Sequence, residues 1–132
     1  MKLTCDMGES FGSYKIGCDE QGLKYVHIAN IDCGAHGGDP MVMEKTVALA
    51  VQHKVIVGAH PGYPDLQGFG RRTIDYTTAE IRTMVLYQTG ALAAFCTAAR
   101  TQLGYVKPHG TLYNTMMAND TILLAVFQAL AS

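Results

Sequence analysis

The chain has 132 residues, which is enough for one hydrophobic core but not for several domains. Hydrophobic residues make up 48% of it and charged residues only 16%, a composition typical of a well-packed domain rather than a disordered segment. The formal net charge of −1 at pH 7 gives no electrostatic reason to expect nucleic acid or an anionic membrane as a partner.

The sequence shows no targeting or membrane-spanning segment. Asp6 comes too early for the apolar region of a signal peptide, and the longest apolar runs, such as residues 123–127, are far too short to span a bilayer. The cysteines form no CxxC pair and lie in or beside apolar segments, so we expect buried, reduced thiols and a cytoplasmic location. The four cysteines are Cys5, Cys18, Cys33 and Cys96.

The first part of the chain is predicted to contain two strands and two helices. In chain order these are a strand at residues 2–7, a weak helix at 19–25, a strand at 27–31 and a helix at 40–53. The start of the last helix is the best defined, because the Asp39 side chain can accept from free backbone amides and Pro40 fits the first helical position. A glycine-rich turn that carries His36 precedes this helix.

The middle of the chain is predicted to contain a buried strand, a long loop and a long helix. Residues 55–59 are apolar throughout, as in a strand buried on both faces of a parallel sheet. The loop that follows has roughly 17 residues, which is long for a compact domain and typical of a binding loop. Thr77 and Glu80 form a capping box, which predicts a helix from residue 78 to about residue 102.

Two residues inside that helix depart from a simple amphipathic pattern. Gln88 falls on the apolar stripe, and we expect its amide to be satisfied by backbone groups. Gly90 costs about 1 kcal/mol relative to alanine in a helix interior, so we expect it to allow a close contact between helix and sheet.

The last part of the chain is predicted to contain a brief strand at residues 105–107 and a polar turn at residues 108–114. Asn119 or Asp120 then caps a final apolar helix that runs through Leu130. The whole chain therefore reads as one α/β domain, residues 1–132, of four β-loop-α units of about 33 residues each. Such alternation implies right-handed crossovers and a parallel sheet.

Ionisable residues follow each predicted strand. In parallel α/β folds the carboxyl ends of the strands meet on one face, so we expect these side chains to form a cluster with coupled pKa values. Three of the five histidines fall at such ends, which favours a functional site over isolated structural histidines. The residues at the strand ends are Asp6, Glu9, Asn30, Asp32, His36, His60, Asp65, Lys107 and His109.

Five motifs in chain order resemble a known family. They are Asp6-Met7-Gly8-Glu9, Asn30 to Asp39 with Cys33, Gly34, His36 and Gly38, Gly58-Ala59-His60-Pro61 with Pro64 and Asp65, Phe69-Gly70-Arg71, and Val106-Lys107-Pro108-His109-Gly110 with Leu112, Tyr113 and Asn114. Over its whole length the chain resembles the LamB/YcsF family, the lactam-utilisation proteins that form one component, the A subunit, of the bacterial ATP-dependent 5-oxoprolinase.

The resemblance implies a distorted (β/α) barrel of about seven strands, of the glycoside hydrolase and deacetylase type. It also implies hydrolytic opening of 5-oxoproline (pyroglutamate) to L-glutamate, with ATP hydrolysis, together with partner B and C subunits. The glycine-rich turn at residues 34–38 lacks the Gly-Lys-Ser/Thr ending of a phosphate-binding P-loop, so we expect ATP to be handled with the partner subunits.

The resemblance and the strand-end positions together assign candidate roles. The candidate catalytic residues are Asp6, Glu9, His36, His60 and His109. The candidate substrate-binding residues are Asn30, Asp65, Arg71, Lys107 and Tyr113. A carboxylate or histidine with a tuned pKa serves as general base, while lysine or arginine holds a substrate carboxylate or a developing oxyanion.

The chain departs from the family pattern in three ways. Asp32 occupies a position where a small apolar residue is expected, and Ala35 one where an aromatic residue is usual. Family members are also roughly twice as long, so the chain resembles the N-terminal half of a barrel, with two unpaired strand edges. We therefore expect a truncated product or a sheet completed by self-association into a homo-oligomer.

Two other functions fit the same residues. A metal-dependent hydrolase of the deacetylase type would use Asp6, His36 and His60 to bind a divalent ion that activates water. No HxxxH or HExxH pairing supports that alternative. A truncated interaction module that binds partners without turnover is the third possibility.

Overall fold

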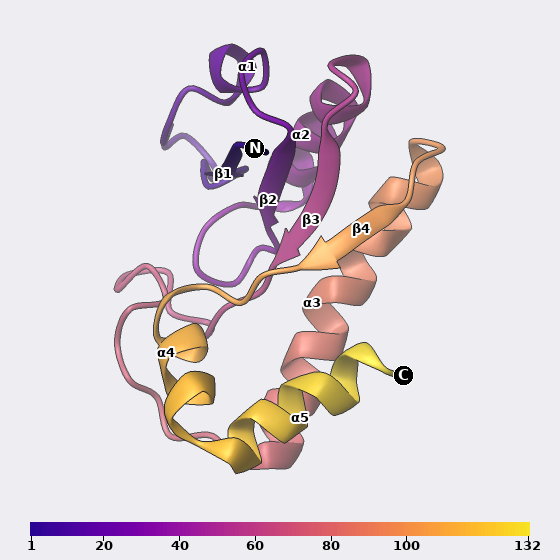
Figure 1. Ribbon diagram of the computed structural model, residues 1–132. Coiled ribbons are helices and arrows are strands. Elements are labelled where there is room, and N and C mark those ends of the chain that lie inside the picture. Colours follow the sequence, from indigo (N-terminus) through magenta and orange to yellow (C-terminus); the bar gives the residue numbers. More distant parts are fainter.

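Four parallel strands form one curved sheet in the computed structural model, which describes residues 1–132 (Figure 1). The strands are β1 (Thr4–Met7), β2 (Ile28–Asp32), β3 (Ile56–His60) and β4 (Leu103–Val106). Each strand pairs with its neighbours in sequence, so the order is β1-β2-β3-β4. This order is typical of (β/α) barrels, whereas doubly wound folds reverse it at a switch point. The predicted α/β class is confirmed, and the sheet is consistent with a partial (β/α) barrel.

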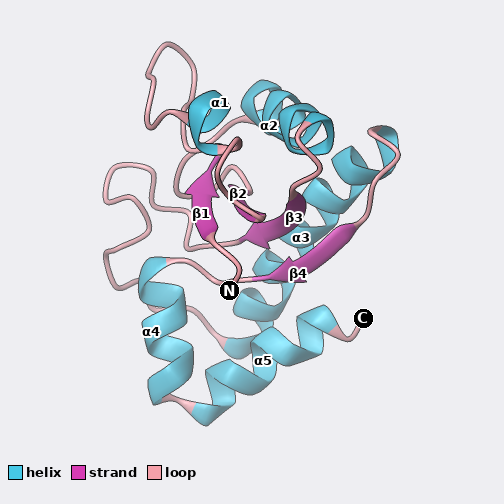
Figure 2. Cartoon of the chain, turned by 45° about the horizontal axis from the view of Figure 1, so that its top comes forward, coloured by secondary structure: helices cyan, strands magenta, loops and turns pink.

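Five helices follow the strands and loops. They are α1 (Asp19–Gly22), α2 (Pro40–Gln52), α3 (Thr78–Ala98), α4 (Gly110–Ala118) and α5 (Asp120–Leu130). Helices α2 and α3 cover one face of the sheet, and α5 packs across the first half of α3 (Figure 2). None of the helices combines the length and the apolar character needed to cross a membrane.

The predicted helix starts are confirmed by their hydrogen bonds. The Asp39 side chain accepts from the Val42 amide at 2.9 Å and thereby caps α2. The capping box is complete at the start of α3, where the Thr77 side chain accepts from the Glu80 amide and the Glu80 carboxylate accepts from the Thr77 amide. Asn119 caps α5 through its side-chain oxygen. These caps satisfy backbone donors that a helix leaves free at its first turn.

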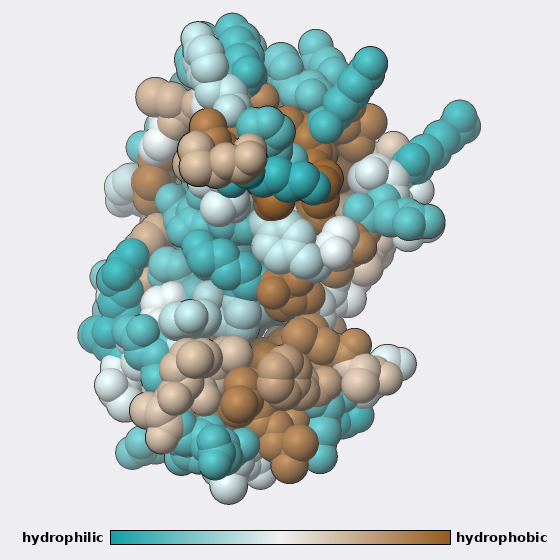
Figure 3. Space-filling view, viewed as in Figure 1, coloured by the Kyte–Doolittle hydropathy of each residue, from teal (hydrophilic) through white to brown (hydrophobic).

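Helix α3 joins two separate apolar cores. The first lies between the sheet, α2 and the second half of α3, where Leu92 is fully buried. The second lies between the first half of α3, α4 and α5, where Ile81 and Leu112 are fully buried. Apolar side chains also gather on the surface over α5 (Figure 3), where Leu124 is 56% and Phe127 55% exposed. That surface is an unpaired apolar face of the chain.

Helix α4 corrects one sequence prediction, since residues 108–114 were expected to form a polar turn. The segment instead enters a helix at Gly110, and the helix continues to Ala118. Leu112 and Met116, four residues apart, bury their side chains in the second core. Tertiary packing therefore selects the helix, because no side-chain cap marks its start in the sequence.

The end of α3 corrects another prediction, because the helix ends at Ala98 rather than near residue 102. Arg100 adopts a left-handed backbone with φ of +59°, and the Thr101 amide donates to the Cys96 carbonyl at 2.9 Å. This closing pattern normally uses glycine at the left-handed position. Since arginine occupies it here, the sequence carries no ordinary stop signal.

Of the two predictions made for Gln88 and Gly90, one is confirmed and the other is wrong. The Gln88 amide donates to the Gly62 carbonyl at 2.8 Å and accepts from the Gly62 amide at 3.0 Å, which confirms that backbone groups satisfy it. Gly90 is exposed, and a Cβ atom added there would meet nothing within 4 Å. The predicted close contact at Gly90 is therefore wrong.

The cysteines also divide into two groups. Cys33 and Cys96 are buried as expected, whereas Cys5 and Cys18 are exposed, so the prediction of four buried thiols is wrong for two of them. No disulfide joins any of them.

Candidate functional site

The carboxyl ends of the four strands place the candidate residues on one rim of the sheet. Along a strand, side chains alternate between its two faces, so Met7 and Ile31 enter the apolar core while Asp6, Asn30 and His60 project from the opposite face. Lys107 directly follows β4, and its backbone amide still donates to the Ala59 carbonyl of β3 at 2.8 Å. The predicted convergence of these strand ends is confirmed for this set.

Asp6 is the centre of a hydrogen-bonded network. One of its oxygens, Oδ1, accepts from Lys107 Nζ at 2.8 Å and from Asn30 Nδ2 at 2.7 Å. The other oxygen, Oδ2, lies 3.4 Å from His60 Nε2. The His60 imidazole, followed by the Lys107 and Asn30 donors, holds the pKa of the Asp6 carboxyl well below its usual value despite partial burial. Asp6 is therefore an ionised carboxylate at neutral pH.

His60 and His109 face each other across the rim. His60 Nδ1 lies 2.6 Å from the Lys107 carbonyl oxygen, and His109 Nε2 lies 2.8 Å from the Phe69 carbonyl oxygen. A carbonyl oxygen only accepts, so each of these nitrogens carries its hydrogen. The two remaining nitrogens, His60 Nε2 and His109 Nδ1, are 2.9 Å apart.

His109 is neutral at pH 7. Burial lowers the pKa of its imidazole to about 4, and the neighbouring His36, His60 and Arg71 act in the same direction. A neutral imidazole keeps one nitrogen lone pair available to accept a proton or bind an electrophile.

His36 lies under this pair, completely buried. Its ring stacks on the His109 ring with a centroid separation of 3.7 Å and an interplanar angle of 3°. Its Nε2 is 2.9 Å from Asp32 Oδ2, but neither ring nitrogen, nor Asp32 Oδ2, makes a hydrogen bond. Gly62 lets the next loop close over the ring, because a Cβ there would sit 2.6 Å from His36 Nδ1. The extra acid at Asp32 therefore contacts His36 directly.

Glu9 and Arg71 border the cluster. Burial raises the pKa of the Glu9 carboxyl, and the negative charges of Asp6 and Asp32 raise it further. A raised pKa makes a carboxylate a stronger base, which suits it to accept a proton from water. The Arg71 guanidinium is exposed and lies 6.0 Å from the Phe69 ring centroid, and that ring meets the cluster edge-on.

Two predicted substrate-binding residues make no side-chain hydrogen bond to the cluster. Asp65 is buried, and its carboxylate is bound by Arg72 and by the Gly68 amide, so it organises its own loop. The Arg72 guanidinium lowers the pKa of the Asp65 carboxyl. Tyr113 is exposed on α4, and its hydroxyl has no hydrogen-bond partner within the chain.

Sequence reasoning missed Tyr105, whose hydroxyl donates to Asn30 Oδ1. Its ring lies across Gly58, where any Cβ atom would overlap it. Asn30 Nδ2 also donates to Thr4 Oγ1 at 3.0 Å, so Asn30 is held from several sides and positions Asp6. Tyr105 lies two residues before Lys107 and thus on the same face, and that spacing was an available signal.

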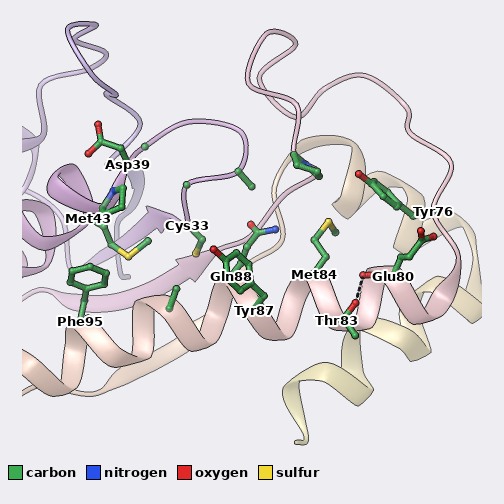
Figure 4. Close-up of a pocket in the computed structure, with 16 residues that line it drawn as sticks. Cys33, Asp39, Met43, Tyr76, Glu80, Thr83, Met84, Tyr87, Gln88 and Phe95 are labelled. Carbon is green, nitrogen blue, oxygen red and sulfur yellow. Dashed lines mark hydrogen bonds between the residues drawn. The ribbon is translucent and has the colours of Figure 1, made fainter.

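Ala35 lies outside the cluster, at the wall of a groove of about 760 Å³ between α2 and α3 (Figure 4). The labelled Tyr76, Met84, Tyr87 and Phe95 form much of its apolar lining. No ionisable residue of the cluster lines this groove. The small side chain at this position therefore borders the helical side of the sheet rather than the candidate site.

The sequence matches known proteins of one family. A profile of the LamB/YcsF family matches residues 1–132. The 5-oxoprolinase A subunit of Vibrio campbellii is 59% identical over 131 residues, which cover 99% of this chain and 52% of that protein. A 5-oxoprolinase A subunit of Pseudomonas aeruginosa is 53% identical over 130 residues, which cover 98% of this chain and 52% of that protein.

A crystal structure of a similar protein has the same fold as this chain. The lactam utilization protein from Thermus thermophilus superposes with a TM-score of 0.96 and 44% sequence identity. The superposition covers 98% of this chain and 52% of that structure.

The sheet order and the ionisable cluster at the strand ends define an α/β protein of the (β/α) type, with its polar chemistry on one rim. The chain belongs to the LamB/YcsF family. It spans about half the length of the curated relatives that it matches.

Proposed function

We propose that the chain acts within an ATP-dependent 5-oxoprolinase, which opens 5-oxoproline by hydrolysis to L-glutamate together with B and C subunits. The names of its relatives support this proposal, since two of them, 59% and 53% identical, are named as A subunits of 5-oxoprolinase. The word subunit in those names supports a complex of several chains. The activity is proposed for the assembled enzyme, because the chain spans about half the length of those relatives.

The ionised Asp6 carboxylate, bound to Lys107 and in contact with His60, is the observation that carries the proposal. A lactam amide is stabilised by resonance, so its hydrolysis needs an activated carbonyl oxygen and a deprotonated water. Glu9, with its raised pKa, is suited to take the proton from water. Lys107 and Arg71 are suited to hold the substrate carboxylate or the oxyanion that develops on the lactam oxygen.

Transfer of a phosphoryl group from ATP would activate the lactam oxygen. The chain has no P-loop ending at residues 34–38, and the Asp39 carboxylate already accepts from the Val42 amide at the start of α2. We therefore assign ATP binding to the partner subunits. The rim described here would receive the lactam rather than the nucleotide.

We further propose that the four strands belong to a seven-stranded barrel of the glycoside hydrolase and deacetylase type, in a cytoplasmic homo-oligomer. The consecutive strand order supports the barrel, because β1 and β4 each pair on one side only. The exposed apolar surface over α5, with Leu124 and Phe127, supports an additional packing partner on that face.

An assay of 5-oxoproline-dependent ATP hydrolysis, with and without the B and C subunits, tests the proposed reaction. We expect turnover only when all subunits are present, and a loss of it in His60→Ala. His53→Ala, at the end of α2 and away from the rim, is the matched control and should retain activity. Full activity of His60→Ala would overturn the site assignment, and partner binding without turnover would identify an interaction module.

A metal-dependent hydrolase is the second candidate function. A cluster of imidazoles favours it, since ring nitrogens of His36, His60 and His109 all lie within 4.8 Å of one another. In that case activity would be lost on chelation and regained with a divalent ion.

A further inference from the structure

Two side-chain atoms, one from His109 and one from Asp6, lie close to His60 Nε2 at the rim. His60 Nε2 lies 2.9 Å from His109 Nδ1 and 3.4 Å from Asp6 Oδ2. His60 and His109 are 1% and 2% exposed, whereas the Asp6 side chain is 37% exposed. The space around His60 Nε2 is therefore enclosed by the two imidazoles and open on the side of the carboxylate.

Each of the three side chains is held from its far end. His60 Nδ1 donates to the Lys107 carbonyl, and His109 Nε2 donates to the Phe69 carbonyl. Asp6 Oδ1 accepts from Lys107 and Asn30, which leaves Oδ2 directed toward His60. Histidines that bind metals usually donate their other ring N–H to a carbonyl or carboxylate in this way.

When both imidazoles are neutral, these tautomers direct the lone pairs of His60 Nε2 and His109 Nδ1 at each other across 2.9 Å. Two facing lone pairs repel, so a positive centre has to lie between them. We propose that Asp6, His60 and His109 bind a divalent transition-metal ion of the Zn²⁺ class at this point. A shared proton is the competing occupant of the same position.

The two separations from His60 Nε2 are close to those around a tetrahedral ion. Metal bonds of about 2.0–2.1 Å place neighbouring ligand atoms about 3.3 Å apart. The distance between Asp6 Oδ2 and His60 Nε2, 3.4 Å, meets this requirement. The two imidazole nitrogens have to separate by about 0.4 Å, which a small rotation of either ring provides.

The donor set indicates the class of metal. Two imidazole nitrogens and one carboxylate oxygen suit Zn²⁺, Fe²⁺ or Co²⁺, whereas Mg²⁺ and Ca²⁺ prefer oxygen ligands only. The open side leaves a fourth position for water or for the lactam oxygen, where the ion would activate either one.

The ring geometry excludes His36 from the ligand set that the sequence suggested. Its ring is parallel to that of His109 and 3.7 Å from it. An ion bound to the in-plane lone pair of His109 Nδ1 lies in the plane of the His109 ring. It is therefore about one stacking distance away from the parallel plane of the His36 ring. Because imidazole lone pairs lie in the ring plane, His36 contacts His109 as a stacked neighbour and does not reach the ion.

Calorimetric titration of the chelator-treated chain with Zn²⁺ at about pH 7.5 tests this site, and it does not depend on the proposed reaction. We expect one ion per chain, and visible absorption typical of a tetrahedral site when Co²⁺ replaces Zn²⁺. Asp6→Asn and His109→Asn should each weaken binding by at least roughly tenfold. Far-UV circular dichroism of each variant verifies folding, and Asp6→Asn, at a half-exposed position, serves if the buried variant does not fold.

Two control variants show whether a loss of Zn²⁺ binding is specific to the proposed ligands. His36→Phe preserves the stacked ring and should bind Zn²⁺ as the unmodified chain does, and so should His53→Asn. No saturable binding by the unmodified chain, or equal binding by Asp6→Asn and His109→Asn, would overturn the metal site and leave the shared proton as the occupant. Loss of binding in His36→Phe would overturn the ligand set.

Discussion

The two carboxylates of the rim, Asp6 and Asp32, have opposite surroundings. Asp6 is partly exposed, and donors from three different strands or strand ends hold it in place. Asp32 is 1% exposed, and its Oδ1 accepts from the Gly34 amide while its Oδ2 contacts His36 without a hydrogen bond. The first region is an organised polar network, and the second is a buried contact between a carboxylate and an imidazole, 2.9 Å apart, that lacks hydrogen-bond geometry.

The difference shows which region destabilises the fold. A buried polar atom without a partner costs about 1–3 kcal/mol, whereas a satisfied network costs little and fixes the geometry of its members. Such costs concentrate at functional sites. The Asp6 region is therefore the organised part of the site. Simultaneous replacement of Asp32 and His36 is the change that should recover the most folding free energy.

Asp6→Asn should have the largest effect. The amide keeps the size of the side chain but removes the charge that binds Lys107 and faces His60. Loss of a positioned acid–base or electrostatic group lowers turnover by about 10²–10⁴-fold. The assay is 5-oxoproline-dependent ATP hydrolysis by the complete complex, with Asp120→Asn on the exposed start of α5 as control. Unchanged turnover in Asp6→Asn would show that the organised region is not the reacting one.

Asp32→Ala should lower the free energy of unfolding by about 3 kcal/mol, because it removes the buried carboxylate that contacts the fully buried His36 imidazole at 2.9 Å. The double variant Asp32→Ala/His36→Phe should be less destabilised than the sum of the two single variants, since it removes both buried polar groups. Urea unfolding of the four chains measures this coupling. Additive losses would mean that the two side chains do not act as a pair.

Stability should fall as the pH is lowered from 6.5 toward 4. His109 has a folded pKa of about 4 against an ordinary value of 6.5, so in this interval the unfolded chain binds a proton that the folded chain does not. Its contribution is complete above pH 6.5 and declines by up to about 3 kcal/mol toward pH 4. Urea unfolding in chelator across this interval should show a smaller slope for His109→Asn. Equal slopes would place the pH dependence elsewhere.

Gly90→Ala should have the smallest effect and the opposite sign. The position is exposed in α3 and has open space around it, so alanine should raise the free energy of unfolding by about 1 kcal/mol. Thermal unfolding measures it. Since Gly90 lies outside both regions, turnover should not change. A loss of stability would indicate that this face of α3 is covered in the folded assembly.

Local patterns predicted most of the strands and helix starts, while the partners of individual side chains depended on the tertiary structure. The capping box at Thr77 and the Asp39-Pro40 start needed only short-range hydrogen bonds, so they were readable in sequence. Helix α4 was not, because Leu112 and Met116 become buried only when α5 packs beside them. Asp65 was placed at the site by its position after β3, yet the long loop turns it toward Arg72.

By itself the sequence determined that ionisable side chains would stand at the carboxyl ends of parallel strands, because strand alternation and glycine-rich turns are local properties. Only the tertiary structure decided how those side chains act. It directed the carbonyls of Lys107 and Phe69 onto two histidines and so turned their free nitrogens toward each other. It also separated Asp6, which Lys107 and Asn30 hold by hydrogen bonds, from Asp32, whose Oδ2 makes none, since burial and donor geometry depend on contacts between distant parts of the chain.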